Sequence, residues 1–266
     1  SLDNIGAPHF YRRYRVKTLK RFFRYERAGW LFVLPGLLYM LVFVGYPIIY
    51  NIVLSLQDVT QKNLISGERH YIALFRDNVF LHSIGNTLIY TVCCLVLQFV
   101  IGFALALFFT KKFSFSKPVR GLLMMPWMIP ITVTALMFKF IFGTDGGILN
   151  YILKSLGLIS QNIDWLTSSG TAMVALIVAN VWIGIPFNMI LISTGLTTIP
   201  TELYESTSID GAGKLSTVFK ITLPLLRPTI ESVLILGFIY TFKVFDLVFV
   251  MTGGGPVNST QMLSTY

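Results

Sequence analysis

The chain has 266 residues, of which 54% are hydrophobic and only 12% are charged, and its formal net charge is +9. An ordinary soluble domain carries roughly 25% charged residues, so this composition, with its repeated apolar runs of about 20 residues, excludes that class and predicts an all-α polytopic membrane protein. The excess of Lys and Arg would suit nucleic-acid binding, but these residues flank the apolar runs, where they act as topology signals, and this argues against a nucleic-acid partner.

Residues 1–29 form a basic N-terminal arm that precedes the first apolar run, and residues 30–266 form the predicted transmembrane domain. We expect the arm to be cytoplasmic, either as a simple topology anchor or as an interfacial helix on the anionic inner leaflet. Its basic residues are Arg12, Arg13, Arg15, Lys17, Lys20, Arg21, Arg24 and Arg27.

Five apolar runs predict membrane-spanning helices, each longer than the ~17–20 residues that cross the hydrocarbon core. They are Trp30–Leu56, Ile84–Phe109, Leu122–Phe142, Ala172–Gly195 and Ile230–Met251. Lys and Arg are concentrated in the arm, in the 110–121 loop and in the 196–229 loop, which places these segments in the cytoplasm. Five spans then put Tyr266 on the outer side.

Proline and glycine interrupt two of these runs. Pro126 and Pro130 fall at or near the start of the third run, and Gly184 and Pro186 lie in the middle of the fourth. Such breaks free backbone groups that neighbouring helices or water in a cavity must satisfy. They are either simple kinks or the borders of a translocation pathway.

The fifth run contains two charged residues, Lys243 and Asp246. Charges inside a membrane are costly and usually face a bundle interior or a cavity. The i, i+3 spacing would let the two neutralise each other on one helix face. The alternatives are a lysine that extends toward the interface, a partly solvated Asp246, or contact with a transported substrate.

The 196–229 loop is too patterned for a simple connection. Thr201 is expected to N-cap a short helix with Glu202 and Glu205 in its first turn, and Gly211 suits a left-handed stop. A second segment begins near Lys214 and ends at Pro224. It carries an apolar stripe at helical spacing, formed by Leu215, Val218, Phe219 and Thr222. The pattern fits either a docking element for a cytoplasmic partner or a segment that packs on the chain's own helices.

This loop resembles the EAA loop of permease subunits in binding-protein-dependent ABC importers. The family pattern is Glu-Ala-Ala, then Asp-Gly-Ala, then an apolar segment that ends Leu-Pro. The matching residues are Glu205-Ser206-Thr207, Asp210-Gly211-Ala212 and Leu223-Pro224, so small polar residues replace both alanines of the first triplet.

Further motifs extend the resemblance over residues 30–265 and are similar to the carbohydrate branch, which includes the larger maltose-importer permease. They are NTLIYTV, MMPWMIP, GILNYIL, NVWIGIPFNMIL and FKVFDLVFVMTGGGP. The resemblance implies the transmembrane domain of a type I ABC importer in the bacterial inner membrane. It also implies a sixth span beyond Tyr266.

Within that family, such a chain is a non-catalytic permease subunit for sugars or oligosaccharides. The implied partners are a second permease, two cytoplasmic ATPase subunits that bind ATP and Mg, and an extracytoplasmic substrate-binding protein. No cofactor is expected in this chain. The resemblance assigns ATPase docking to the loop residues Glu205, Ser206, Thr207, Asp210, Gly211 and Ala212.

The resemblance also suggests residues of the substrate pathway. The matched positions are Gly184, Phe187, Tyr240, Thr241 and Val244. Aromatic rings stack on the apolar faces of sugars, and hydroxyls hydrogen-bond to them. Because Lys243 lies beside this set, it is a further candidate and would favour an acidic, uronate-containing sugar.

Two other functions need weighing. An ion-coupled secondary transporter that works alone would explain the interrupted helices and the Lys243–Asp246 pair, but it would not explain the patterned loop. A membrane-embedded enzyme would need a catalytic or metal-binding cluster, yet His9, His70 and His82 are scattered in termini and loops. The chain has no Walker A pattern, and the adjacent Cys93 and Cys94 are expected to be packing residues.

Overall fold

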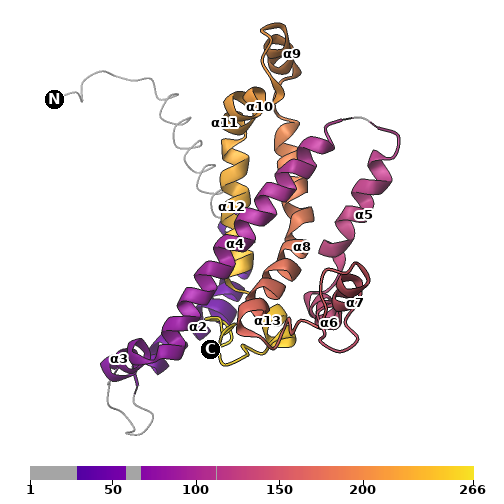
Figure 1. The fold of residues 1–266 in the computed structure, drawn as a ribbon. Helices are drawn as coiled ribbons and strands as arrows, with labels where there is room; N and C mark the ends of the chain where they lie inside the picture. The colour runs from indigo at the N-terminus through magenta and orange to yellow at the C-terminus, as the bar shows by residue number, and fades with distance from the viewer. Residues whose placement is uncertain (1–28, 58–66, 112) are drawn as a thin grey trace, which may run out of the picture. The chain divides into compact units, whose positions relative to one another are not determined.

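The computed structural model describes residues 29–57, 67–111 and 113–266, and the described parts contain helices and no β-strand (Figure 1). The basic residues predicted for the N-terminal arm, together with His9, lie outside the described residues. The chain divides into two compact units, Ser1–Leu74 and Phe75–Tyr266, which are described separately below.

The described part of the first unit is dominated by one helix, Gly29–Ser55, which is 27 residues long and apolar enough to cross a membrane. It matches the first predicted span. The helix includes a π-helical segment, Leu41–Gly45, followed by α2, Tyr46–Ser55. The π-turn directly precedes Pro47, whose ring and missing N–H disturb the regular α-helical register. Helix α3, Gly67–Arg76, spans the boundary between the units.

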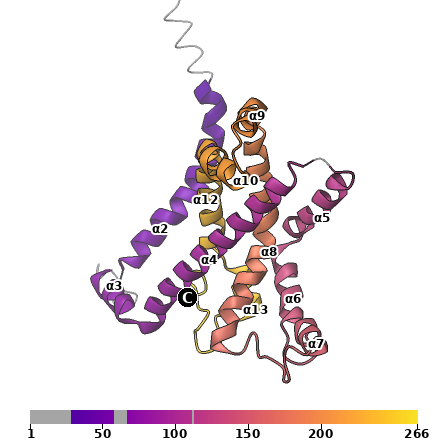
Figure 2. The same cartoon turned by 45° about the horizontal axis from the view of Figure 1, so that its top comes forward.

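Two long crossing helices organise the second unit, α4 (Asn78–Phe108) and α8 (Ser169–Leu196) (Figures 1 and 2). Helix α4 starts before the predicted Ile84 because Asp77 caps it, accepting a 2.8 Å hydrogen bond from the Val79 N–H. The two helices approach closely at Gly102, where an added β-carbon would lie 2.6 Å from Cβ of Asn188.

The third predicted span is two helices rather than one. These are α5 (Ser116–Met128) and α6 (Ile131–Ile141), bent by 98° relative to each other. Pro130 lies at the bend, and the preceding Ile129 is extended because a residue before proline avoids the α-helical region. Pro126 lies inside α5, so neither proline marks the start of the span as predicted.

The fourth predicted span is one helix, α8, which continues through Gly184 and Pro186. Gly184 and Pro186 therefore do not break this helix. A short helix, α7 (Ile148–Ser155), precedes it and follows α6 along the chain.

The fifth predicted span, Ile230–Met251, is wrong as a single helix. Helix α12 covers Arg227–Phe242, and a separate short helix, α13, covers Asp246–Met251. The break is held by the C-terminal segment, because the Ser264 hydroxyl donates a hydrogen bond to the carbonyl of Val244. Counting by length and composition, the described residues contain three helices that could cross a membrane, or up to five if each of two bent pairs is one span.

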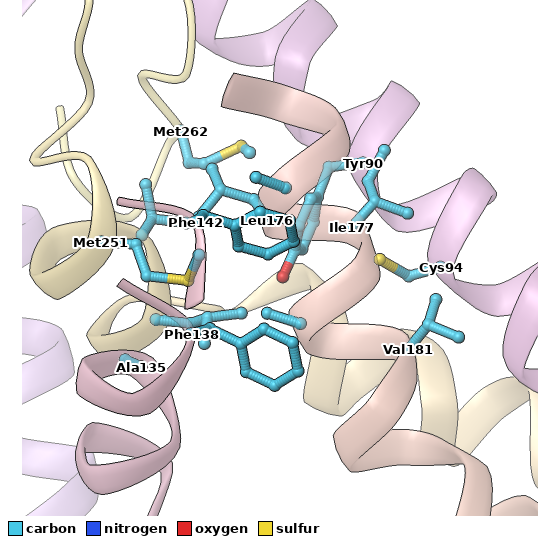
Figure 3. Close-up of a cluster of buried hydrophobic side chains, with 14 residues drawn as sticks. Tyr90, Cys94, Ala135, Phe138, Phe142, Leu176, Ile177, Val181, Met251 and Met262 are labelled. Atoms are coloured by element: carbon cyan, nitrogen blue, oxygen red, sulfur yellow. The ribbon is translucent and has the colours of Figure 1, made fainter. Parts of the chain in front are cut away.

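The main core lies where α4, α6, α8 and α13 meet (Figure 3). Tyr90 and Cys94 of α4 point into it beside Leu176 of α8, Phe138 of α6 and Met251 of α13. Cys94 is fully buried and Cys93 is partly buried, and both are free thiols. Their positions agree with the predicted packing role.

Candidate functional site

A cavity of about 460 Å³ lies between α4, α5, α8, α12 and the break before α13. The six predicted pathway residues come from two helices and the break that follows α12, and the structure brings all of them to this cavity. They are Gly184, Phe187, Tyr240, Thr241, Lys243 and Val244. The structure therefore brings together residues that lie up to sixty positions apart in the sequence, and their function stays a prediction.

Aromatic side chains form a continuous row along the cavity. The ring centroids of Trp127 and Phe187 are 5.8 Å apart, with the two rings tilted. Those of Phe187 and Tyr240 are also 5.8 Å apart, and this second pair is edge-to-face. The three rings come from α5, α8 and α12. Trp127 was not among the predicted pathway residues, although it stands at the centre of the MMPWMIP motif.

Polar side chains also line the cavity. Gln98 of α4 is almost fully buried, and its Nε2 donates a 3.0 Å hydrogen bond to the Asn180 carbonyl on α8. A β-carbon at position 184 would lie 2.2–2.6 Å from the Gln98 carboxamide, so this side chain would have to move and its bond to Asn180 would be disturbed. Among the described residues, no hydrogen-bond partner is found for the buried Nδ2 of Asn180. Gln98 and Asn180 were missed, although each is a polar residue within an apolar run.

The two charged residues at the cavity are not paired on one helix face as expected. Lys243 follows the last residue of α12, Asp246 is the first residue of α13, and the non-helical break separates them. Within the described parts of the chain, the ion pair that forms is Arg227–Glu231, at 2.8 Å, and Lys243 has no such partner. Its Nζ instead lies 5.4 Å from the centroid of the Tyr240 ring.

The 196–229 loop is a helix–turn–helix element at the end of α8 opposite to α13 (Figures 1 and 2). Helix α9 covers Thr201–Ile209 and has Asp210 as its C-cap residue, and the following Gly211 has φ +72°. The Ala212 N–H bonds to the Thr207 carbonyl at 3.0 Å, and the Gly211 N–H bonds to the Ser208 carbonyl at 3.2 Å. This is a Schellman motif, so the predicted glycine stop is confirmed.

Other details of the loop differ from expectation. Thr201 is the first helical residue and provides no cap, Pro200 precedes it, and of the two glutamates only Glu202 lies in the first turn. The second segment consists of α10 (Lys214–Thr217), a π-helical segment (Val218–Thr222) and α11 (Leu223–Leu225), so Pro224 does not end it. Pro224 has no N–H to donate within a helix. The residue before it, Leu223, donates its N–H to the Val218 carbonyl five residues back, so the chain forms a π-turn at this point and the helix continues.

The predicted docking residues form a small exposed surface around the glycine turn. Glu205, Ser206, Asp210 and Gly211 are exposed, and Thr207 and Ala212 are half-buried. The hydroxyls of Ser206 and Thr207 both donate to the Leu203 carbonyl one turn back. The two residues that replace the family's alanines therefore satisfy their hydroxyls locally and present little more than small side chains.

The predicted apolar stripe is divided between packing and exposure. Thr222 is buried and Val218 is half-buried, whereas Leu215 and Phe219 are largely exposed, as is Ile209 at the end of α9 (85%). The Tyr204 hydroxyl lies 3.3 Å from the Thr222 hydroxyl, which connects α9 to the second segment. Part of the loop thus packs on the chain, and part presents an uncovered apolar surface.

The base of the loop is built into a second core. Leu196 and Ile192 of α8 pack with Leu226 and Val233, and Tyr204 packs against this cluster. The helix α10–α11 is bent by 73° relative to α12 at Leu226, which is almost fully buried. Since the loop joins α8 directly to α12, it connects the two helices that carry the cavity residues Phe187 and Tyr240.

The motif NTLIYTV holds the C-terminal segment in place. Asn86 Nδ2 donates a 3.1 Å hydrogen bond to the Gln261 carbonyl, and the Leu263 N–H donates a 3.0 Å bond to the Thr87 hydroxyl. Tyr266 donates a 2.6 Å hydrogen bond to Asp77, the residue that caps α4. Among the described residues, no group of three or more His, Cys, Asp or Glu side chains could hold a metal ion.

Comparison with known proteins gives a consistent result. Residues 98–266 match the family described as binding-protein-dependent transport system inner membrane component. The chain is 33% identical over 251 residues to the trehalose/maltose transport system permease protein MalF of Thermococcus litoralis, covering 93% of this chain and 84% of that protein.

Solved structures of a bacterial transporter are also similar. One is an ABC transporter involved in the import of the acidic polysaccharide alginate, with a TM-score of 0.80 and 25% identity over 94% of this chain and 85% of that chain. Another is the alginate ABC transporter in complex with an alginate pentasaccharide-bound periplasmic protein, with a TM-score of 0.78 and 26% identity over 94% and 83% of the two chains.

Proposed function

The chain belongs to the family of binding-protein-dependent transport system inner membrane components, and from this premise we propose that it is the permease subunit of an ATP-driven importer of sugars or oligosaccharides. The observation that carries the proposal is the connection between the cavity and the loop. One loop joins α8 to α12, and these helices supply Phe187 and Tyr240 to the cavity. A stand-alone, ion-coupled transporter is not favoured, because family membership and the loop both point to an importer complex.

The cavity has the surface chemistry that a sugar requires. A row of aromatic rings offers flat apolar faces, and Thr241, Gln98 and Asn180 offer hydrogen-bonding groups beside them. The names of the relatives support this class, since one is a trehalose/maltose permease and one transporter imports alginate. The sugar would pass through this cavity during transport.

Within this class, Lys243 favours an acidic sugar. It reaches the cavity as a cation without a carboxylate partner among the described residues, so a uronate carboxylate would supply the missing counter-charge. The likeness to a transporter of an acidic polysaccharide supports the same reading. Asp246 at the opposite side of the break would disfavour a substrate carboxylate that approached from there, which restricts the binding orientation.

The 196–229 loop would couple this cavity to ATP. In the proposed mechanism, Glu205, Ser206, Thr207, Asp210, Gly211 and Ala212 contact a separate ATPase subunit, with the exposed Ile209, Leu215 and Phe219 burying apolar area there. The chain itself is non-catalytic, and ATP and Mg are bound by two ATPase subunits. ATP drives a conformational change only if it favours one state over the other. The loop is where that difference would reach α8 and α12.

A second permease would complete the pathway, and a substrate-binding protein would deliver the sugar to the outer face. The family description and the complex of the alginate transporter with a periplasmic protein support the delivery step. With the loop in the cytoplasm, the N-terminus also faces the cytoplasm, and the break at Lys243 lies toward the outer side.

Purification and reconstitution test this function. The chain should co-purify with an ATPase and a second permease, and proteoliposomes containing the complex should take up sugar only with internal ATP and the binding protein. Uptake that follows an imposed ion gradient without ATP, by the chain alone, would refute the proposal. The inactive control is the same complex with an ATPase subunit unable to hydrolyse ATP.

A further inference from the structure

Helix α7, Ile148–Ser155, is fixed to the protein by one face only. Its Asn150 is buried and donates a 3.0 Å hydrogen bond to the Ile163 carbonyl. The Asn150 Oδ1 accepts bonds from the Trp165 indole N–H, at 3.0 Å, and from the Ile163 N–H, at 3.2 Å. These bonds determine which side of the short helix faces the protein.

The opposite face of α7 is apolar and uncovered. Ile148, Tyr151, Ile152 and Leu156 follow the i, i+3, i+4, i+8 spacing of one helix face, and all four are exposed, Tyr151 by 73% and Leu156 by 66%. Leu158, just beyond the helix, is also exposed. A contiguous apolar surface of this kind indicates an interaction partner rather than water.

The position of α7 identifies the partner as the lipid surface. The helix begins just after the apolar run 122–142 ends, and α6 packs against it. Phe140, near the end of α6, is 77% exposed and extends the membrane-facing surface toward α7. In Figures 1 and 2, α7 lies at the rim of the second unit, away from the crossing of α4 and α8.

The composition of α7 fits the boundary between hydrocarbon and water. Tyr151 combines an exposed ring with a polar hydroxyl, and Lys154 is exposed beside it. Aromatic and basic side chains of this kind are typical of the headgroup region. We propose that α7 is an interfacial helix whose exposed face inserts into the headgroup region of the leaflet on the side of α13, opposite the 196–229 loop.

Insertion of α7 into the membrane surface would fix the position of α6, which forms part of the cavity wall. Ile131, at the start of α6, lines the cavity, and α7 follows at the other end of the same helix. Since α6 is separated from α5 by the bend at Pro130, its own membrane contact and that of α7 would hold it at a constant depth. The inference does not depend on which substrate passes through the cavity.

Fluorescence quenching tests the proposal in the full complex, reconstituted in nanodiscs. A Tyr151→Cys variant carries an environment-sensitive fluorophore, and an Asp145→Cys variant, in the exposed turn before α7, serves as the matched control. The unsubstituted chain, with Cys93 and Cys94, gives the labelling background. Quenchers are aqueous iodide and a phospholipid with a spin label close to its headgroup.

At position 151 we expect iodide quenching at least about fivefold weaker than at position 145, with strong quenching by the spin-labelled lipid, because an interfacial helix lies about 5–10 Å within the boundary region. Equal iodide quenching at the two positions would overturn the proposal. So would shielding from iodide without lipid quenching, which would indicate a covering protein chain. Shielding that develops only on adding the binding protein would instead identify a protein-docking surface.

Discussion

Among single residues, Lys243 has the most direct consequence for specificity. Its ammonium group lies at the cavity beside the Tyr240 ring, and no acidic side chain of the described chain pairs with it. The Lys243 side chain is exposed, so its charge is hydrated in the free protein, and a bound substrate carboxylate would replace that water. The effect of this replacement can be measured as a difference between acidic and neutral sugars.

We therefore predict that Lys243→Met selectively impairs uptake of a uronate oligosaccharide. A charge-assisted hydrogen bond contributes roughly 1.5–3 kcal/mol, which corresponds to about a 10- to 100-fold increase in the apparent KM. Uptake of a neutral oligosaccharide of the same length should change little. Lys117→Met, in the exposed first turn of α5 and outside the cavity, is the matched control. An equal loss for both sugars would rule out charge recognition.

At Gly184, on the cavity wall, the neighbouring Gln98 side chain leaves little room for a side chain. A β-carbon there would meet the Gln98 side chain, so Gly184→Ala should cost about 1–3 kcal/mol through overpacking and reduce uptake. Shortening the neighbour in Gly184→Ala/Gln98→Ala should recover thermal stability in detergent. Gly170→Ala, in the same helix but with open space around it, is the control and should be neutral. No recovery in the double variant would contradict the packing explanation.

Asp77 is the residue for which a pH dependence follows. Hydrogen bonds from the Tyr266 hydroxyl and then from the Val79 N–H lower the pKa of Asp77 below its usual 3.8. A lowered pKa stabilises the folded state above the unfolded value, and this contribution is lost as pH falls through the folded pKa. Protection of the first turn of α4 from hydrogen exchange should thus be constant at neutral pH and fall below about pH 3.8. In Tyr266→Phe the loss should start at higher pH; an unchanged profile would contradict the link.

At the scale of elements, periodicity predicts where apolar helices exist but not where they bend. The first, second and fourth helices follow from apolar runs that are long enough to cross a membrane. The bend at Ile129–Pro130 has a sequence signal, because proline restricts the residue before it, yet Pro186 has the same signal and α8 continues through it. Tertiary packing decides between the two outcomes.

The break at Lys243 has no local signal at all. At the break, the Val244 carbonyl accepts a hydrogen bond from the Ser264 hydroxyl, a residue that lies twenty positions later in the chain. Phe187 and Tyr240 could be predicted because the family resemblance assigned these positions to the substrate pathway. Gln98 and Asn180 were missed because their contribution arises from the crossing of α4 and α8, which the linear sequence does not describe.

The glycine turn after α9 gives a prediction for the loop as an element. Gly211 has φ +72°, which proline cannot adopt, and its N–H is used in the Schellman motif. Gly211→Pro should therefore distort the docking surface while membrane insertion stays intact, so that ATP hydrolysis continues without transport. Glu205→Lys/Asp210→Lys should have the same effect through charge.

Gly213→Ala provides the control for this loop, since Gly213 has φ −67° and open space around its α-carbon. ATP hydrolysis and sugar uptake are measured together in proteoliposomes, and their ratio reports coupling. Normal uptake per ATP in the Gly211→Pro and charge-reversal variants would count against the docking role. A loss of membrane insertion would show that the turn is needed for folding instead.

At the scale of the whole second unit, the loop and helices α8 and α12 are packed together as one connected body. Leu196, Leu226 and Val233 share a core at the loop, and the same helices reach the cavity in the middle of α8 and near the C-terminal end of α12. Packed helices of this kind transmit a displacement as rigid bodies rather than absorbing it. A force on α9 should therefore change which side of the cavity is open.

We predict that ATP changes the accessibility of the cavity in opposite directions from the two sides of the membrane. In Val244→Cys, labelling by a membrane-impermeant thiol reagent should fall from one side and rise from the other when ATP is trapped on the complex. Coupling energies of about 1–3 kcal/mol correspond to changes of about 5- to 150-fold. The unsubstituted chain corrects for Cys93 and Cys94. The same experiment with Gly211→Pro added should show no ATP effect, whereas an unchanged response would show that α8 and α12 receive the ATP signal by a route other than this loop.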